Sequence, residues 1–138
     1  MLNRNFLTLG FVMLLAAVLF CGCGGGDKSN PLKTDSSMII GTWDLTGMTS
    51  RFGGNSYNVP NEEILADPLA YTFRPDHSGI MYYQGDVINF SWNTNGDNLT
   101  MSSYGYTMVS FTFGVNSKNL HLSFQEQEYY ITHIFTKR

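Results

Sequence analysis

Cysteine, histidine and basic residues are scarce in this chain, and each scarcity excludes a class of function. The two cysteines, Cys21 and Cys23, lie one residue apart, so the sequence after them has no disulfide. Only three histidines accompany them, which argues against a metal site. Lysine and arginine total 8 against 11 acidic residues, a formal net charge of -3. Because no basic cluster occurs, nucleic acid is not an expected partner.

Motifs of common enzyme classes are also missing. The sequence shows no glycine-rich phosphate loop, no nucleophile elbow and no paired-carboxylate site. Asp76, His77 and Ser78 are the residue types of a hydrolytic triad. Neighbours along one turn cannot adopt the triad geometry, however, because the base must contact both partners from a separate element. We therefore expect no catalytic residue, no cofactor and no enzymatic activity.

The one long apolar run of the chain has the dimensions of an export signal. Arg4 precedes it, and from Phe6 to Phe20 every residue is apolar except Thr8 and Gly10. A run of about fifteen residues is too short to span a bilayer and matches the apolar region of a secretory signal peptide.

The two cysteines follow this run directly. Residues so close in sequence seldom form a disulfide with each other, and two thiolates alone do not complete the four-ligand set of structural zinc. The segment Phe20-Cys21-Gly22-Cys23 instead resembles the lipobox of bacterial lipoproteins, where a small residue precedes the lipidated cysteine. The resemblance implies removal of a signal peptide, residues 1–22, and lipidation of Cys23 with diacylglyceryl and palmitate chains. Several acyl chains would anchor the protein stably in a membrane.

Residues 23–37 are then predicted to be the lipidated N-terminus and a flexible tether, because glycine, serine and asparagine are frequent there. Residues 38–138 are predicted to be one all-β domain, since aromatic residues, threonine and glycine recur at short intervals. The predicted strands are 38–47, 69–74, 79–84, 87–93, 98–102, 104–113, 119–125 and 128–136. Between the first two strands, residues 60–67 favour one or two helical turns with Asn61 as N-cap.

The hairpin turns provide a test of whether these strands share one apolar face. Four turns pair apolar with apolar residues: Asn95-Gly96 (Trp92 opposite Leu99), Gly85-Asp86 (Tyr83 opposite Ile88), Asn116-Ser117 (Phe113 opposite Leu120) and Glu126-Gln127 (Phe124 opposite Tyr129). Residues 75–78 need an odd-length loop or a bulge. We therefore predict eight antiparallel strands in simple succession, which close more readily into a barrel than stay open.

Gly41-Thr42-Trp43, at the start of the first strand, matches the G-x-W signature of the lipocalin-like (calycin) barrels. Segments 71–79 and 92–99 look like those of small lipocalin-like lipoproteins of Bacteroidota, and residues 134–138 are similar to the way such barrels end. The resemblance covers about residues 38–138. It implies an eight-stranded up-and-down barrel with a short helical insertion after the first strand, in a lipoprotein of the cell outer membrane.

The same resemblance gives three residues a structural role. Gly41 would allow a close approach at one barrel end, Trp43 would plug that end, and Arg138 would stack on its indole ring. Residues 49–68 could form a lid over the open end.

Binding without catalysis is the predicted function. The candidate lining of a small apolar ligand site comprises Tyr71, Phe73, Met81, Tyr83, Phe90, Trp92, Phe111, Phe124, Tyr129 and His133. His133 would give the one polar contact, or it is a neutral core histidine hydrogen-bonded to a tyrosine.

The alternative is a solid-core protein-interaction module of the cell envelope, because so many rings could fill an eight-stranded barrel. Its partner surface would consist of outward-facing residues: Tyr104, Tyr106, Met108, Ile80 and Tyr82.

Overall fold

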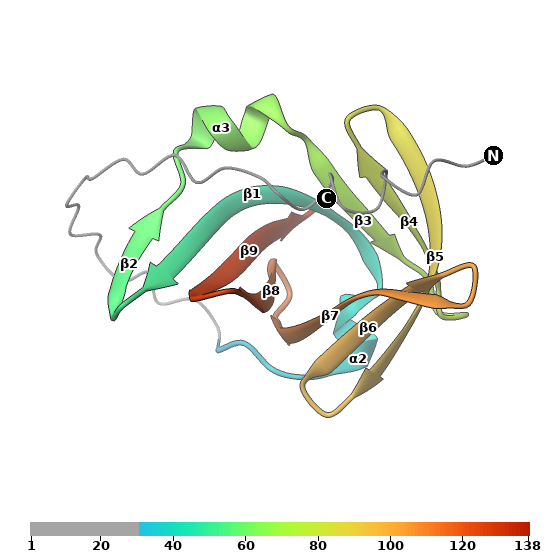
Figure 1. Cartoon of the computed structure of the whole chain (residues 1–138). Helices are drawn as coiled ribbons and strands as arrows, with labels where there is room; N and C mark the ends of the chain where they lie inside the picture. Colours follow the sequence, from blue (N-terminus) through green and yellow to red (C-terminus); the bar gives the residue numbers. More distant parts are fainter. Residues whose placement is uncertain (1–30) are drawn as a thin grey trace.

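The computed structural model describes residues 31–138, which form a closed antiparallel β-barrel (Figure 1). The predicted signal peptide, Cys23 and the first part of the predicted tether lie outside these residues. Sheet neighbours follow the order β2-β1-β3-β4-β5-β6-β7-β8-β9, and β1 also pairs with β9. Eight strands therefore close the ring, as predicted, and the short β2 lies beside β1.

The elements in chain order are α2 (Ser36–Ile39), β1 (Gly41–Phe52), β2 (Asn55–Asn58), α3 (Asn61–Ala66), β3 (Leu69–Phe73), β4 (Ser78–Tyr83), β5 (Asp86–Asn95), β6 (Asn98–Ser103), β7 (Tyr106–Val115), β8 (Asn119–Glu126) and β9 (Tyr129–Lys137). No helix among residues 31–138 is long and apolar enough to cross a bilayer.

The segment before β1 differs from its prediction. Met38 and Ile39 belong to α2 instead of the first strand, because the side chain of Asp35 accepts a hydrogen bond from Ser37 N and caps the turn. Lys33, in the predicted tether, is bound to the barrel: its N–H donates to Val115 O at 2.8 Å, and Val115 N–H donates to Lys33 O at 2.7 Å. The end of the predicted tether is therefore part of the folded domain.

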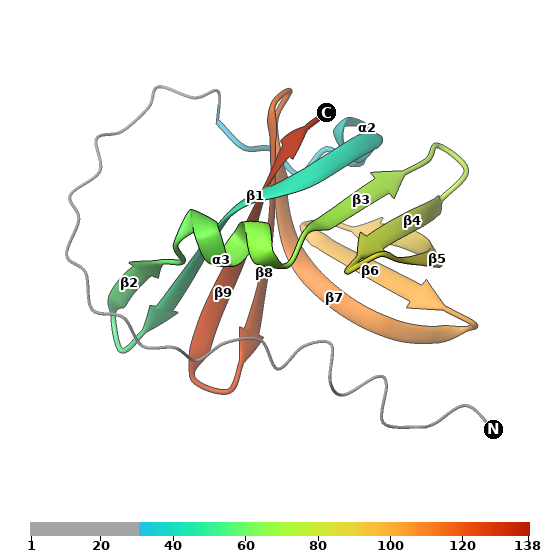
Figure 2. The same cartoon turned by 90° about the horizontal axis from the view of Figure 1, so that it is seen from above.

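The connection from β1 to β3 contains a hairpin that the sequence did not predict, followed by the predicted helix. β1 runs on to Phe52 and turns through two glycines into β2. The N-cap of α3 is Pro60, without a side-chain hydrogen bond, so the prediction of Asn61 was wrong. β1 pairs with β3 only over Gly41–Asp44, and α3 lies where these two strands diverge (Figures 1 and 2). Ile64 of α3 is buried there.

The predicted register was wrong by two residues in each of the four hairpins. In the structure Trp92 lies opposite Met101, Met81 opposite Ile88, Phe113 opposite Leu122, and Phe124 opposite Ile131. An offset of two leaves every side chain on its predicted face, because strand side chains alternate with a period of two.

The predicted odd-length loop between β3 and β4 is confirmed. Phe73 lies opposite Gly79 and Arg74 N–H donates to Ser78 O at 2.9 Å, which leaves a three-residue loop, 75–77. His77 occupies the left-handed position of this loop, with φ 64°.

The two ends of the barrel differ. One end, which we call the closed end, has α2 and the turns β3–β4, β5–β6 and β7–β8. The opposite end, which we call the mouth, has the turns β1–β2, β4–β5, β6–β7 and β8–β9. Trp43 fills the closed end, as predicted: it is fully buried, and its Nε1–H donates to Ile39 O at 2.6 Å. Gly41 also has its predicted role, since a Cβ there would lie 2.8 Å from Lys137 Cε.

At the mouth β7 and β8 separate (Figure 2). Their ladder runs only from Val115 opposite Leu120 to Thr112 opposite Ser123. β7 nevertheless reaches back to Tyr106 and β8 forward to Glu126. The barrel wall therefore opens along this seam, and the opening positions the candidate site.

Candidate functional site

The closed half of the barrel is packed with aromatic rings. Tyr71 lies 5.8 Å from Phe73, 6.0 Å from Phe90 and 5.3 Å from Phe135, measured between ring centroids. Phe73 contacts Trp92 edge-on at 5.6 Å. Distances in this range are those of favourable aromatic pairs. Five of the ten predicted lining residues are buried in this core: Tyr71, Phe73, Phe90, Trp92 and Phe111. The structure shows no space for a ligand around these five side chains.

The other five predicted residues are only partly buried. Met81 and Phe124 pack against the core. Tyr83 is next to the β4–β5 turn, and Tyr129 stacks on Phe52 beside the β1–β2 turn at 4.9 Å. His133 lies deeper, between Phe124 and Phe135. The structure therefore does not bring the ten residues together around one interior space.

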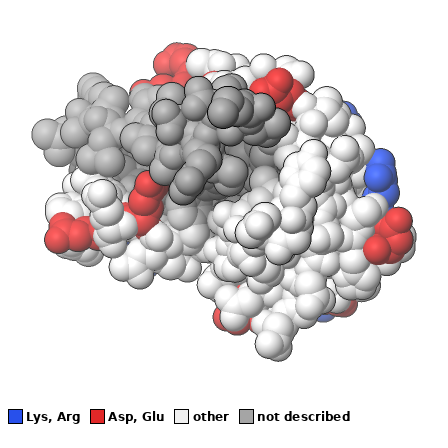
Figure 3. Space-filling view, turned by 45° about the vertical axis from the view of Figure 1, so that its right-hand side comes forward, with Lys and Arg blue, Asp and Glu red and all other residues white. Residues whose placement is uncertain are grey.

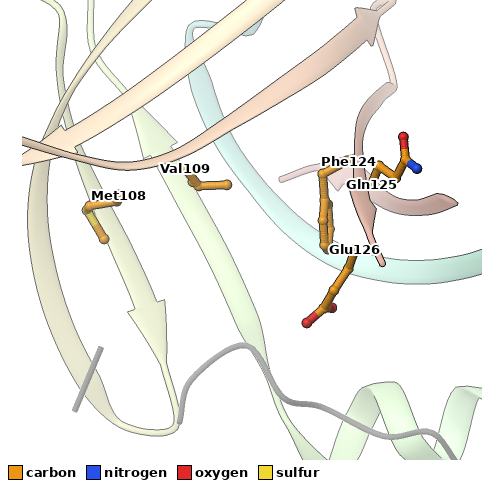
Figure 4. A pocket seen from close by; sticks show the side chains of 5 residues that line it. All are labelled: Met108, Val109, Phe124, Gln125 and Glu126. Atoms are coloured by element: carbon orange, nitrogen blue, oxygen red, sulfur yellow. The ribbon is translucent and has the colours of Figure 1, made fainter. Parts of the chain in front are cut away.

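A pocket of about 230 Å³ lies at the seam between β7 and β8. Met108 and Val109 of β7 form one side, and Phe124, Gln125 and Glu126 of β8 form the other (Figure 4). Val109 points across the pocket toward Phe124, whose ring extends toward Glu126, whereas the Gln125 amide points away from the pocket (Figure 4). Of the ten residues predicted from the sequence, only Phe124 lines this pocket.

A β-bulge explains why Met108 faces the pocket. Met101 lies opposite Val109, but the next residue of β6, Ser102, lies opposite Thr107. Met108 is the extra residue and leaves the regular alternation. It was predicted to face outward, yet it is partly buried and packs against the core. The inward orientation of Met108 could have been predicted only by predicting the bulge, and the sequence gives no sign of it.

Behind Phe124 lies the most perturbed histidine of the described chain. The rings of Phe124 and His133 are 5.3 Å apart and nearly perpendicular. His133 as a residue is partly exposed, but its Nδ1 is fully buried and has no hydrogen-bond partner within residues 31–138. Burial lowers the pKa of His133 to about 4. The imidazole is therefore neutral near pH 7, and the predicted hydrogen bond to a tyrosine is not formed.

His77, which the sequence suggested only as a turn residue, lies on the outer side of the closed end. Its ring is 4.7 Å from that of Trp92, and its Nδ1 is 3.1 Å from Trp92 O. Ser78 N and Oγ both donate to Asp76 Oδ1, at 3.0 and 2.6 Å. These contacts are those of a turn, and they hold the β3–β4 loop against β5.

The basic residue over the Trp43 ring is Lys137, so the prediction of Arg138 was wrong. Lys137 Nζ lies 5.2 Å from the ring centroid, because Lys137 is the β9 residue opposite Trp43. Arg138 instead forms a two-point contact with Asp44, at 2.6 and 3.0 Å. Both partners are largely exposed, so this ion pair contributes little stability.

Charge is distributed unequally between the two ends. Among residues 31–138, the one basic residue at the mouth is Arg51, near the end of β1. The acidic residues around the mouth are Glu62, Glu63, Asp67, Asp86, Glu126 and Glu128. On the face shown in Figure 3 acidic side chains are spread over a mostly uncharged surface. The mouth therefore has a negative electrostatic potential.

Comparison with protein-family models, with curated proteins and with solved structures gave no match.

Proposed function

We propose that this protein binds a small apolar ligand at the seam between β7 and β8, without catalysis. The observation that carries the proposal is the pocket of about 230 Å³ lined by Met108, Val109 and Phe124 at the point where the β7–β8 ladder stops. The pocket is open to the surface and its lining is partly apolar; small ligands usually bind in concave, mostly apolar sites. Each methylene that enters contributes about 0.8 kcal/mol.

The rigidity of the surrounding barrel supports this proposal. The solid aromatic core of the closed half fixes the strands on which the pocket residues lie. A preformed site costs less ordering entropy on binding than a mobile one. The ligand would therefore occupy the mouth, whereas the sequence predicted it deeper in the barrel.

The test uses residues 23–138 with Cys23→Ser, which contain every described strand and the whole described core. N-phenyl-1-naphthylamine, a neutral apolar fluorophore, should brighten and shift to the blue on addition of this protein. Val109→Trp should abolish the signal, because its side chain would fill the pocket. Ser110→Trp is the matched control, since Ser110 is the exposed neighbour on the same strand. Circular dichroism checks that both variants fold. Equal signals from both variants would refute the site.

We further propose that the protein is attached to the bacterial outer membrane through lipidated Cys23. The lipobox resemblance of residues 20–23 and the preceding apolar run support this proposal. Metabolic labelling with palmitate should mark the wild type and Cys21→Ser but not Cys23→Ser. Labelling of Cys23→Ser would contradict the assignment.

One observation favours the alternative of an envelope interaction module. Tyr104 is 97% exposed, although it sits at a hairpin turn with φ 52°, a conformation that bulky residues disfavour. Its neighbour Tyr106 is 78% exposed. A photo-crosslinking residue at position 104 should trap a defined envelope protein in cells, while the same residue at Leu65, which is also exposed, should not. Crosslinking that is identical at the two positions would remove this alternative.

A further inference from the structure

The pocket at the seam has an acidic edge as well as an apolar floor. Met108, Val109 and Phe124 supply the apolar surface, and Glu126 is the one carboxylate among the described residues that line it. Figure 4 shows the Glu126 side chain extending past Phe124 at the edge of the pocket. Glu126 is only partly exposed, so water screens its charge less than that of a fully exposed residue.

The charge of Glu126 is not balanced by a basic side chain of the described chain. Within residues 31–138 the salt bridge Arg138–Asp44 is the only one, and it lies at the closed end. Arg51, the base at the mouth, has its Nε directed to Ser56 Oγ at 3.4 Å. The surrounding acids of the mouth add to the negative potential at the pocket. A carboxylate beside an apolar pocket in such a field favours a positively charged group.

We propose that the ligand of this pocket is an amphipathic cation, with its apolar body between Val109 and Phe124 and its positive group at Glu126. The inference rests on the proposed apolar ligand site and names the class of molecule that enters it. Fatty acids and other anionic amphiphiles, in contrast, would place a negative charge beside the Glu126 carboxylate.

The experiment compares three probes with eight carbons each and head groups of different charge: octylammonium (positive), octanol (neutral) and octanoate (negative). Isothermal titration calorimetry with residues 23–138, Cys23→Ser, should give the order octylammonium, octanol, octanoate from tightest to weakest. Glu126→Gln should weaken octylammonium about fivefold and leave octanol unchanged, because one partly screened charge contact is lost. Glu128→Gln changes an exposed acid two residues away that does not line the pocket, and it should keep most of the preference. Added salt should reduce the preference for the cation.

The outcomes distinguish the proposed apolar ligand site from the proposed preference of that site for a cation. If all three probes bind equally and Glu126→Gln changes nothing, the apolar site stands and the cation is refuted. If Glu128→Gln removes as much affinity as Glu126→Gln, the preference comes from the general field, and the contact at Glu126 is refuted. If no probe binds, or if Val109→Trp leaves binding intact, the proposed function itself fails.

Discussion

Lowering the pH from about 7.5 to about 5 should destabilise the barrel, and His133 should account for most of the loss. Its pKa is about 4 in the folded protein and 6.5 when it is unperturbed. The unfolded chain therefore takes up the proton first as the pH falls. The stabilisation is fully present above pH 6.5 and is lost as the pH falls toward 4.

The size of the effect follows from the two pKa values. One pKa unit corresponds to about 1.4 kcal/mol, so the full loss is roughly 3 kcal/mol, of which about 2 kcal/mol should have occurred by pH 5. Replacing His133 by Phe removes the titrating group and keeps a ring between Phe124 and Phe135. It also removes a buried nitrogen without a partner in the described chain, which should raise stability at neutral pH by about 1 kcal/mol.

Urea unfolding followed by the fluorescence of Trp43 and Trp92 measures both quantities. The wild type should lose about 2 kcal/mol more than His133→Phe between the two pH values. Burial also lowers the pKa of His121, so His121→Gln serves as the control and should retain most of the wild-type loss. If His133→Phe loses as much stability as the wild type, the reasoning about the buried imidazole is refuted.

Three further predictions concern stability and use the same urea assay. Gly79→Ala should cost about 1–3 kcal/mol, because its Cβ would lie 2.3 Å from Phe90 Cζ; a loss near zero would mean that the barrel relaxes there. Trp43→Phe should cost about 1–3 kcal/mol, since Ile39 O loses its buried donor; an unchanged midpoint would contradict this. Tyr104→Asn should gain up to about 1 kcal/mol, because asparagine tolerates the φ of 52° better; a loss would show that the tyrosine contributes contacts.

The sequence predicted the barrel because one face of each strand is apolar, but this pattern could not fix the turns. In the β4–β5 and β8–β9 hairpins the true turns place Gln84 and Gln127 at positive φ, although glutamine is not a typical turn former. Turn chemistry therefore pointed one residue away at these two hairpins. The apolar pattern could not detect the error, because a shift of two in register changes no face.

The candidate site was predictable only in part, for a related reason. Phe124 was identified because it faces inward whether or not its strand is paired. Alternation continues through Val109 and Phe124 with no sign that the β7–β8 ladder ends at Thr112 and Ser123. The position where two paired strands separate depends on how whole strands bend in the tertiary structure. The pocket lies at such a position, and so the sequence did not reveal it.

The pairing of β1 with β9 has a consequence for how the molecule is made. Thr46 Oγ1 and Thr136 Oγ1 are 2.7 Å apart, although 90 residues separate them in the chain. During synthesis β1 emerges from the ribosome long before the strand that completes its sheet on that side. Contacts between residues so distant in sequence form slowly, because the intervening loop must close first. Until β9 is made, one edge of β1 stays available to other chains, so the nascent protein should be most prone to aggregation just before its last strand appears.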